Sequence, residues 1–223
     1  MFRKYEKTFH ITGDRMFKRL MDSHEISHLF NGEVVVEEKV DGANVGIIRT
    51  KKGIQLQKRG SLVGPSEHAQ FQRFHAWAQY ENYNKLMEIP IGYTVYGELM
   101  YAVHTVYYDA LPDWVLVFDI YDWKNKRYLT YDERNEFCLK YGLYQVPLLD
   151  RGHFEAKDVP SMLPVKSSFG PQAEGIVIKR YIKKSKQYVR GKYVHPDFLK
   201  TVDESDHWIK GELRINRLRV ENE

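Results

Sequence analysis

The sequence predicts an α+β fold in which antiparallel sheets are flanked by helices. Short β-branched runs alternate with turn residues, a few segments space their apolar residues like amphipathic helices, and no internal repeat or low-complexity linker interrupts the chain. A chain of 223 residues can bury one substantial core. We therefore expect a single domain over residues 1–223, with residues 195–223 as a basic C-terminal tail.

The first part of the chain is expected to hold two helices around a run of strands. Apolar spacing predicts a helix over 16–30, which Asn31-Gly32 ends, and a second, long helix from Pro65 to about Met87. The turn Lys51-Lys52-Gly53 predicts a hairpin between two of the strands. These strands are predicted over 33–38, 43–50 and 54–58.

The second part of the chain returns to strands after one further helix. Thr130 and Glu133 form a capping-box pattern that opens a helix, and Tyr141-Gly142 ends it. The single cysteine, Cys138, excludes an internal disulfide framework and is expected to be a small core residue of this helix. An irregular aromatic loop over 100–113 is long enough to suggest a function. Strands are predicted over 93–98, 114–121, 146–149, 175–181 and 188–194.

Composition and charge narrow the class of protein. Hydrophobic residues make up 43% and charged residues 29%, which is the balance of a soluble globular protein. No apolar run approaches the roughly 20 residues that span a bilayer, and the N-terminus lacks a signal-peptide core, so we expect a cytoplasmic protein without a membrane partner. The net charge of +4 is too small to indicate nucleic acid by itself.

The distribution of the basic residues is more informative than their number. A short stretch and the tail concentrate cations, which makes them a candidate phosphate-binding face, although a solvated strand edge has the same composition. The stretch contains Lys179, Arg180, Lys183, Lys184, Lys186, Arg190 and Lys192, and the tail adds Lys210, Arg214, Arg217 and Arg219.

A lysine follows a predicted buried strand in Glu38-Lys39-Val40-Asp41-Gly42-Ala43-Asn44. Gly42 permits a tight turn, and Asp41 can accept hydrogen bonds from backbone amides. Alone, Lys-x-Asp-Gly most often marks a surface turn. Further short patterns follow it in a fixed order, however: Tyr96-Gly97-Glu98-Leu99, Phe118-Asp119, Glu174 to Lys179, and Arg190-Gly191-Lys192.

This ordered series resembles the covalent nucleotidyltransferases, which comprise DNA ligases, RNA ligases and mRNA capping enzymes, in their motifs I, III, IIIa, IV and V. The resemblance covers residues 38–192 and implies an ATP-grasp-like nucleotidyltransferase domain. It also implies that Lys39 attacks ATP and carries AMP. Lys58-Arg59-Gly60 lies where such ligases place an arginine that contacts the nucleotide or the end being joined.

The resemblance assigns a role to each matched residue. Arg190 and Lys192 share strand parity and are expected to contact the α-phosphate, Phe118 to stack on adenine, and Glu98 to bind a ribose hydroxyl. Glu174 is the expected ligand of Mg²⁺ or Mn²⁺. Lys179 is included as catalytic, although strict alternation would point it away from Glu174 unless the strand twists or bulges. The expected nucleotide contacts are Glu38, Asp41, Gly42, Asn44, Arg59, Glu98, Phe118, Glu174 and Lys192.

Attack on phosphorus requires a neutral lysine. At an ordinary pKa of about 10.4, roughly one lysine in a few thousand is neutral at pH 7. We therefore expect the site to depress the pKa of Lys39, with Arg190, Lys192 and a divalent metal as the responsible cations.

The segment after Lys192 is too short for the OB-fold domain that DNA ligases and capping enzymes append. Lys192-Tyr193-Val194-His195-Pro196 is more similar to RNA ligases that seal nicks in duplex RNA. We therefore favour an ATP-dependent RNA ligase over a DNA ligase, with nicked RNA as its substrate and a protein partner possible in place of the OB domain.

Two other classes of protein remain as alternatives. His24-Glu25-Ile26-Ser27-His28 matches the H-E-x-x-H pattern of zinc peptidases on a predicted helix. A non-catalytic RNA-binding module could use the aromatic and basic residues for stacking and phosphate contacts. Neither alternative explains the ordered series from Lys39 to Lys192.

Overall fold

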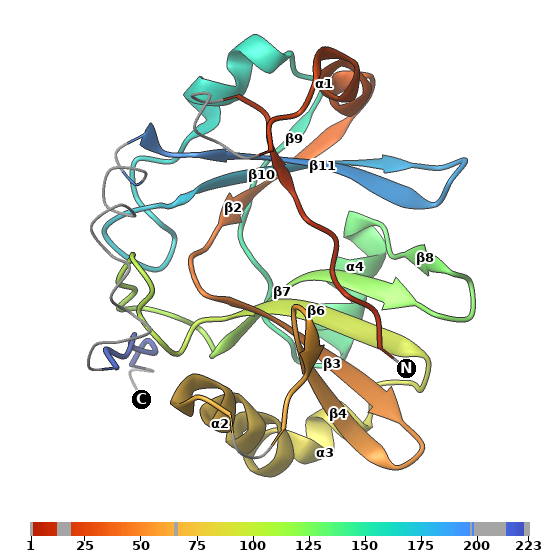
Figure 1. The fold of residues 1–223 in the computed structure, drawn as a ribbon, viewed down its shortest axis with the longest axis vertical. Coiled ribbons are helices and arrows are strands. Elements are labelled where there is room, and N and C mark those ends of the chain that lie inside the picture. Colours follow the sequence, from red (N-terminus) through yellow and green to blue (C-terminus); the bar gives the residue numbers. More distant parts are fainter. Residues whose placement is uncertain (1, 13–18, 65–66, 197, 199–212, 221–223) are drawn as a thin grey trace.

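The computed structural model describes residues 2–12, 19–64, 67–196, 198 and 213–220. Two sheets face each other across a central gap (Figure 1). The first has the order β1-β11-β10-β2-β9 and the second the order β5-β4-β3-β6-β7-β8. All pairings are antiparallel except that of β1 with β11. The predicted α+β architecture is therefore confirmed.

The strand bounds follow the hydrophobic patterns closely. The first sheet contains β1 (Phe9–His10), β2 (Val34–Lys39), β9 (Leu148–Gly152), β10 (Gly175–Ile182) and β11 (Gln187–Val194). The second contains β3 (Ala43–Thr50), β4 (Gly53–Lys58), β5 (Ser61–Leu62), β6 (Tyr93–Leu99), β7 (Val115–Asp122) and β8 (Arg127–Tyr128).

One strand lies further along the chain than predicted. Instead of 146–149, β9 spans Leu148–Gly152, because the chain changes sheets at Pro147. Before this point, the Val146 N–H donates to the Val117 carbonyl of the second sheet, whereas Leu148 pairs with Glu37 of the first. A proline has no N–H to contribute to either ladder, which suits the crossing point.

Most helices cover the outer faces of the two sheets (Figure 1). The helix over residues 131–140 lies between them instead, where its Arg134 pairs with Glu37 of the first sheet and donates to the Phe118 carbonyl of the second. The helices are α1 (Ser23–Phe30), α2 (Ala69–Ala76), a π-helix (Trp77–Glu81), α3 (Tyr83–Met87), α4 (Tyr131–Lys140) and a 3-10 helix (Ala156–Met162). The prediction for α4 is confirmed: Thr130 and Glu133 form the capping box, Gly142 has a φ of 59°, and Cys138 is buried.

Two helix predictions were wrong in their extent. The helix predicted over 16–30 begins only at Ser23, because Asp22 and Glu25 form a capping box; residues 16–18 lie outside the described chain. The helix predicted from Pro65 is divided, and Pro65 itself is not described. Both the backbone and the side-chain amide of Asn82 donate to the Trp77 carbonyl, which widens the helix into the π turn.

Apolar residues gather behind each sheet and leave the facing surfaces to polar and aromatic side chains. Val36, Ile176 and Ile178 pack under α1, and the larger core around Ile47 and Trp77 lies on the outer side of the second sheet. Between the sheets, four buried tyrosines form a separate cluster: Tyr5, Tyr96, Tyr121 and Tyr128. The space between the two sheets is therefore lined mainly by polar and aromatic side chains.

The two terminal segments of the described chain pack against the sheets and the 100–112 loop. Residues 2–8 run between the sheets (Figure 1), where the Gln57 side-chain amide and the Tyr96 hydroxyl both donate to the Arg3 carbonyl. Residues 213–220 lie along the irregular 100–112 loop, with bridges between Ile215 and Ala102 and between Leu218 and Leu111. No helix among the described residues is long and apolar enough to span a membrane.

Candidate active site

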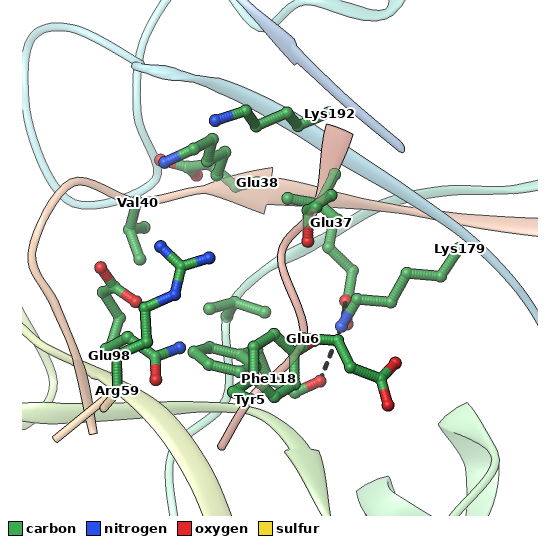
Figure 2. Close-up of a pocket in the computed structure, with 15 residues that line it drawn as sticks. Tyr5, Glu6, Glu37, Glu38, Val40, Arg59, Glu98, Phe118, Lys179 and Lys192 are labelled. Atoms are coloured by element: carbon green, nitrogen blue, oxygen red, sulfur yellow. Dashed lines mark hydrogen bonds and ion pairs between the residues drawn. The ribbon is translucent and has the colours of Figure 1, made fainter. Parts of the chain in front are cut away.

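A pocket opens between the two sheets and contains most of the predicted site residues (Figure 2). Lys39 ends β2, which pairs with β10 so that Lys39 lies opposite Gly175 and beside Glu174. The pocket is lined by Tyr5, Glu6, Thr8, Glu37, Glu38, Lys39, Val40, Asn44, Arg59, Glu98, Phe118, Val146, Val177, Lys179 and Lys192.

Lys39 is surrounded by carboxylates. Its Nζ donates a hydrogen bond to Glu174 Oε2 at 2.5 Å. Burial acts to lower the pKa of Lys39, but the negative charges of Glu174, Glu98 and Asp41 outweigh it and raise this pKa. The expectation of a depressed lysine pKa is therefore wrong for the protein without bound nucleotide or metal. The carboxylates favour the charged ammonium, so bound cations would have to reverse the balance.

The same crowding shifts the acids and the neighbouring lysine. Burial raises the pKa of Glu98 to about 8 and that of Glu174 to about 7, although Lys39 opposes both shifts. Burial also lowers the pKa of Lys192, and the positive charges of Lys39 and Arg59 lower it further. Groups with such pKa shifts concentrate at functional sites, because catalysis requires pKa values that burial and neighbouring charges provide.

The turn after Lys39 is held by strand β6 and by the 100–112 loop. An added Cβ at Gly42 would lie 2.4 Å from the Leu99 carbonyl oxygen, so only glycine lets the turn approach β6 this closely. The Asp41 carboxylate accepts the backbone N–H groups of Thr105 at 2.7 Å and Val106 at 3.0 Å. Asp41 and Gly42 thus shape the turn rather than line the pocket.

Glu38 anchors a second loop. It is buried, and its carboxylate accepts the Ser167 hydroxyl and the Ser168 backbone N–H. The residues on either side of Lys39 and Val40 are therefore bound to irregular segments. Glu38 is bound to the 167–170 loop and Asp41 to the 100–112 loop. The lysine itself remains directed at Glu174.

Phe118 and Val177 line the pocket from opposite sheets, on β7 and β10 respectively. Asn44 lies beside Glu98 across the β3–β6 pairing. Its side-chain oxygen is buried without a hydrogen-bond partner in the described part of the chain. Such an atom calls for a donor, which a ligand in the pocket could supply. Arg59 reaches the pocket from the turn between β4 and β5 and is otherwise exposed.

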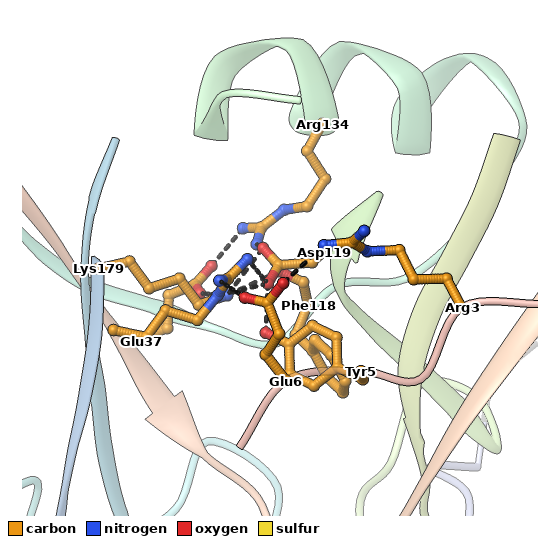
Figure 3. Close-up of polar contacts among 9 residues, drawn as sticks. Arg3, Tyr5, Glu6, Glu37, Phe118, Asp119, Arg134 and Lys179 are labelled. Carbon is orange, nitrogen blue, oxygen red and sulfur yellow. Dashed lines mark hydrogen bonds and ion pairs between the residues drawn. The ribbon is translucent and has the colours of Figure 1, made fainter. Parts of the chain in front are cut away.

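The deeper end of the pocket holds a buried ionic network (Figure 3). Lys179 Nζ lies 2.7 Å from Glu37 Oε2 and 3.2 Å from Asp119 Oδ1, and Arg134 pairs with Glu37. Lys179 does face the pocket, on the same side of β10 as Val177. Alternation does not separate it from Glu174, because Glu174 precedes the strand.

Arg190 is not placed as expected. Its guanidinium lies 3.0 Å from Asp119 Oδ2 and over the Tyr128 ring, and it does not line the pocket. It shares a face of β11 with Lys192 but lies two residues deeper, where Asp119 of the other sheet meets it. The cations Arg190, Lys179 and Arg134 overcome burial and hold the pKa of Asp119 at about 2.

Sequence reasoning missed the pocket residues supplied by the N-terminal segment. The Tyr5 hydroxyl donates to Asp119, its ring lies 5.0 Å from that of Phe118, and Glu6 and Thr8 follow it along the pocket. No local pattern marks these residues. Glu37 was detectable, because a carboxylate in a buried β-branched run requires a partner.

The H-E-x-x-H segment does not form a metal centre. His24 and His28 do stack on one face of α1. However, Glu25 is engaged with the Asp22 backbone N–H, and His28 Nδ1 lies 3.0 Å from an Arg180 guanidinium nitrogen. Within the described chain, no three His, Cys, Asp or Glu side chains are grouped so that they could hold a metal ion.

Comparison with known proteins agrees with this geometry. The family model of RNA ligase matches residues 32–194. Among solved structures, the Naegleria gruberi RNA ligase with pyrophosphate superposes with a TM-score of 0.65 at 21% identity, covering 81% of this chain and 55% of that one. A variant of the same ligase with ATP and manganese gives 0.62 at 21% identity, with the same coverage of both chains. Comparison with curated protein sequences finds no match.

The two facing sheets thus have the fold of an RNA ligase nucleotidyltransferase domain. The chain belongs to the RNA ligase family. It spans about half the length of the solved ligases that it matches.

Proposed function

We propose that this protein is an ATP-dependent RNA ligase that joins a 3′-hydroxyl to a 5′-phosphate through a covalent lysyl-AMP on Lys39. One observation carries the proposal. Lys39 Nζ projects from a strand end into a pocket where Glu174 and Glu98 flank it and Lys192 faces it. A lysine held in a pocket among carboxylates whose pKa values are shifted is suited to nucleophilic catalysis.

Phe118 and Val177 would enclose adenine from the two sheets, and Glu98 would accept a ribose hydroxyl. The unpartnered Asn44 oxygen would accept another nucleotide N–H or O–H. Lys192 and Arg59 would face the phosphates. The related ligase from Naegleria gruberi, solved with ATP and manganese and with pyrophosphate, supports ATP as the nucleotide.

The reaction would proceed in three steps. Lys39 Nζ, having lost its proton, bonds to the α-phosphorus while the bond to the bridging oxygen breaks and pyrophosphate leaves. An oxygen of the RNA 5′-phosphate next attacks the AMP phosphorus and releases Lys39. The RNA 3′-hydroxyl finally attacks the activated 5′-phosphate, forms the phosphodiester and releases AMP.

A divalent metal fits the acidic surplus around Lys39. With no cage of three protein ligands in the described chain, the site suits Mg²⁺ or Mn²⁺ held by one or two carboxylates together with phosphate oxygens and water. Glu174 would be the protein ligand. When bound, the metal supplies positive charge to the phosphates and to the environment of Lys39.

The RNA would lie on a basic surface at one end of the two sheets. The Gln187 side-chain amide donates to the Lys126 carbonyl at 3.2 Å, which joins the β10–β11 turn to the β7–β8 turn. The exposed lysines of the two turns form no ion pairs with described residues. We call them the two-turn lysines: Lys124, Lys126, Lys183, Lys184 and Lys186.

The test offers ATP, a divalent metal and nicked duplexes with RNA or DNA on either side of the nick. The proposal expects sealing when the 3′-hydroxyl strand is RNA, and AMP release in proportion to sealing. Preferential sealing of all-DNA nicks would instead make the protein a DNA ligase. Lys39→Ala serves as the inactive control.

A further inference from the structure

Asn216 belongs to the described C-terminal segment 213–220, and its side chain makes three hydrogen bonds. It is 2% exposed. Its Oδ1 accepts the Tyr108 backbone N–H at 2.9 Å, and its Nδ2 donates to the carbonyls of Met100 at 2.7 Å and Ala102 at 3.3 Å. One side chain thus fixes the 100–112 loop at three points. A buried amide that satisfies three backbone groups is costly to replace, because each group would be left without a partner.

The loop that Asn216 holds reaches the turn next to Lys39. The Tyr108 ring is fully buried, and its hydroxyl accepts the Asp41 backbone N–H at 2.9 Å. The same loop supplies the Thr105 and Val106 amides to the Asp41 carboxylate. A continuous set of hydrogen bonds therefore runs from Asn216 through Tyr108 to Asp41, two residues after the nucleophile.

The second loop beside the site rests on the same residues. The Phe169 carbonyl accepts the amides of Asp109 and Ala110, and a Cβ at Gly170 would lie 2.8 Å from the Tyr107 carbonyl oxygen. This loop holds Glu38 through its serines. A shift of the 100–112 loop would consequently move the anchors on both sides of Lys39.

We propose that Asn216 is a positioning residue for Lys39, acting through Tyr108 and Asp41. The inference rests on the proposed function. Asn216 lies outside the residues matched by the family model, and its hydrogen-bond partners in the described chain, Tyr108, Met100 and Ala102, do not line the pocket. It sets the position of the nucleophile and leaves the nucleotide contacts of Phe118 and Glu98 in place. Its loss should lower the rate of the chemical step without weakening ATP binding.

The experiment compares lysyl-AMP formation without RNA in four proteins: wild type, Asn216→Ala, Tyr108→Phe and the double variant. Because small displacements of reacting groups reduce rates strongly, each single variant should lose about tenfold in the maximal rate constant of lysyl-AMP formation, with the half-saturating ATP concentration changed by less than about twofold. The double variant should also lose about tenfold, since both changes break one connection. Ile215→Ala, a neighbouring residue with an exposed side chain, is the matched control and should keep the wild-type rate.

Tyr108→Phe keeps the buried ring and every contact with Asn216, so it tests the connection even if Asn216→Ala folds poorly. A wild-type rate in Tyr108→Phe, a rise in the half-saturating ATP concentration with an unchanged maximal rate constant, or a hundredfold loss in the double variant would each overturn the proposal. Hydrogen exchange provides a readout without activity: the Asp41 amide should exchange faster in Asn216→Ala, and unchanged exchange would contradict the inference. Wild type that forms no lysyl-AMP at all would instead refute the proposed function.

Discussion

Glu98 should make the free protein less stable as the pH rises, and Glu98→Gln should remove this loss. Burial raises the pKa of Glu98 from 4.5 to about 8, so the native state keeps a proton that the unfolded chain releases. The native state then binds more protons throughout the range between these two values. Stability must fall as pH increases through that range, which is the reverse of an ordinary ion-paired carboxylate.

The magnitude follows from the shift. One pKa unit corresponds to about 1.4 kcal/mol, so the wild type should lose about 4 kcal/mol of unfolding free energy from Glu98 between pH 5 and pH 8. Glutamine imitates the protonated acid and can still accept the Gly42 backbone N–H. The two proteins should therefore be similarly stable at pH 5, and Glu98→Gln should be the more stable by several kcal/mol at pH 8.5.

Urea unfolding at half-unit steps from pH 5 to 9 measures this difference. Glu155→Gln, which changes an exposed carboxylate that pairs with Lys157 and accepts the Asp158 backbone N–H, should follow the wild type and is the control. Parallel wild-type and Glu98→Gln curves, or a less stable Glu98→Gln protein at pH 8.5, would refute the reasoning. The expected curves would mean that the site retains a destabilising acid because function requires it.

Three further results are expected. Glu174→Gln removes the carboxylate 2.5 Å from Lys39 Nζ and should lower the pKa of Lys39, so the acidic limb of the adenylylation pH profile should shift to lower pH by about 1–3 units. An acidic limb that stays in place or shifts to higher pH contradicts this. Gly42→Ala forces a Cβ against the Leu99 carbonyl and should reduce adenylylation at least about tenfold, as followed by AMP transfer; a wild-type rate would show that the close packing is irrelevant. Changing the two-turn lysines Lys183, Lys184 and Lys186 to Ala should weaken sealing of a pre-adenylylated nick and flatten its salt dependence while sparing adenylylation; equal responses of both steps would remove these lysines from the RNA surface.

Local patterns predicted much of the frame of this fold. The β-branched run before Lys39, the hairpin at Gly53 and the cap at Thr130 are each specified by residues close in sequence, and each lies where expected. The divided α2–α3 helix was not predictable in this way. Its π turn depends on the Asn82 side chain competing for one carbonyl, which apolar spacing does not reveal.

The sequence predicted most residues of the site but not the electrostatic interactions among them. Parity placed Arg190 and Lys192 on one face of a strand, but only the opposite sheet, through Asp119, determines that Arg190 is occupied elsewhere. The pKa of Lys39 likewise depends on Glu174 and Glu98, which are distant in sequence. Long-range pairing sets these properties, and residues such as Tyr5 join the site through a segment without any recognisable pattern.

Covalent AMP on Lys39 is the most direct test of the proposed chemistry. The protein would be incubated with ATP and Mg²⁺ or Mn²⁺, and intact-mass analysis followed by peptide mapping would locate the adduct. The proposal predicts one AMP on Lys39, its loss in Lys39→Ala, and its release when pyrophosphate is added. AMP retained by Lys39→Ala on another residue, or far stronger labelling by GTP than by ATP, would contradict it.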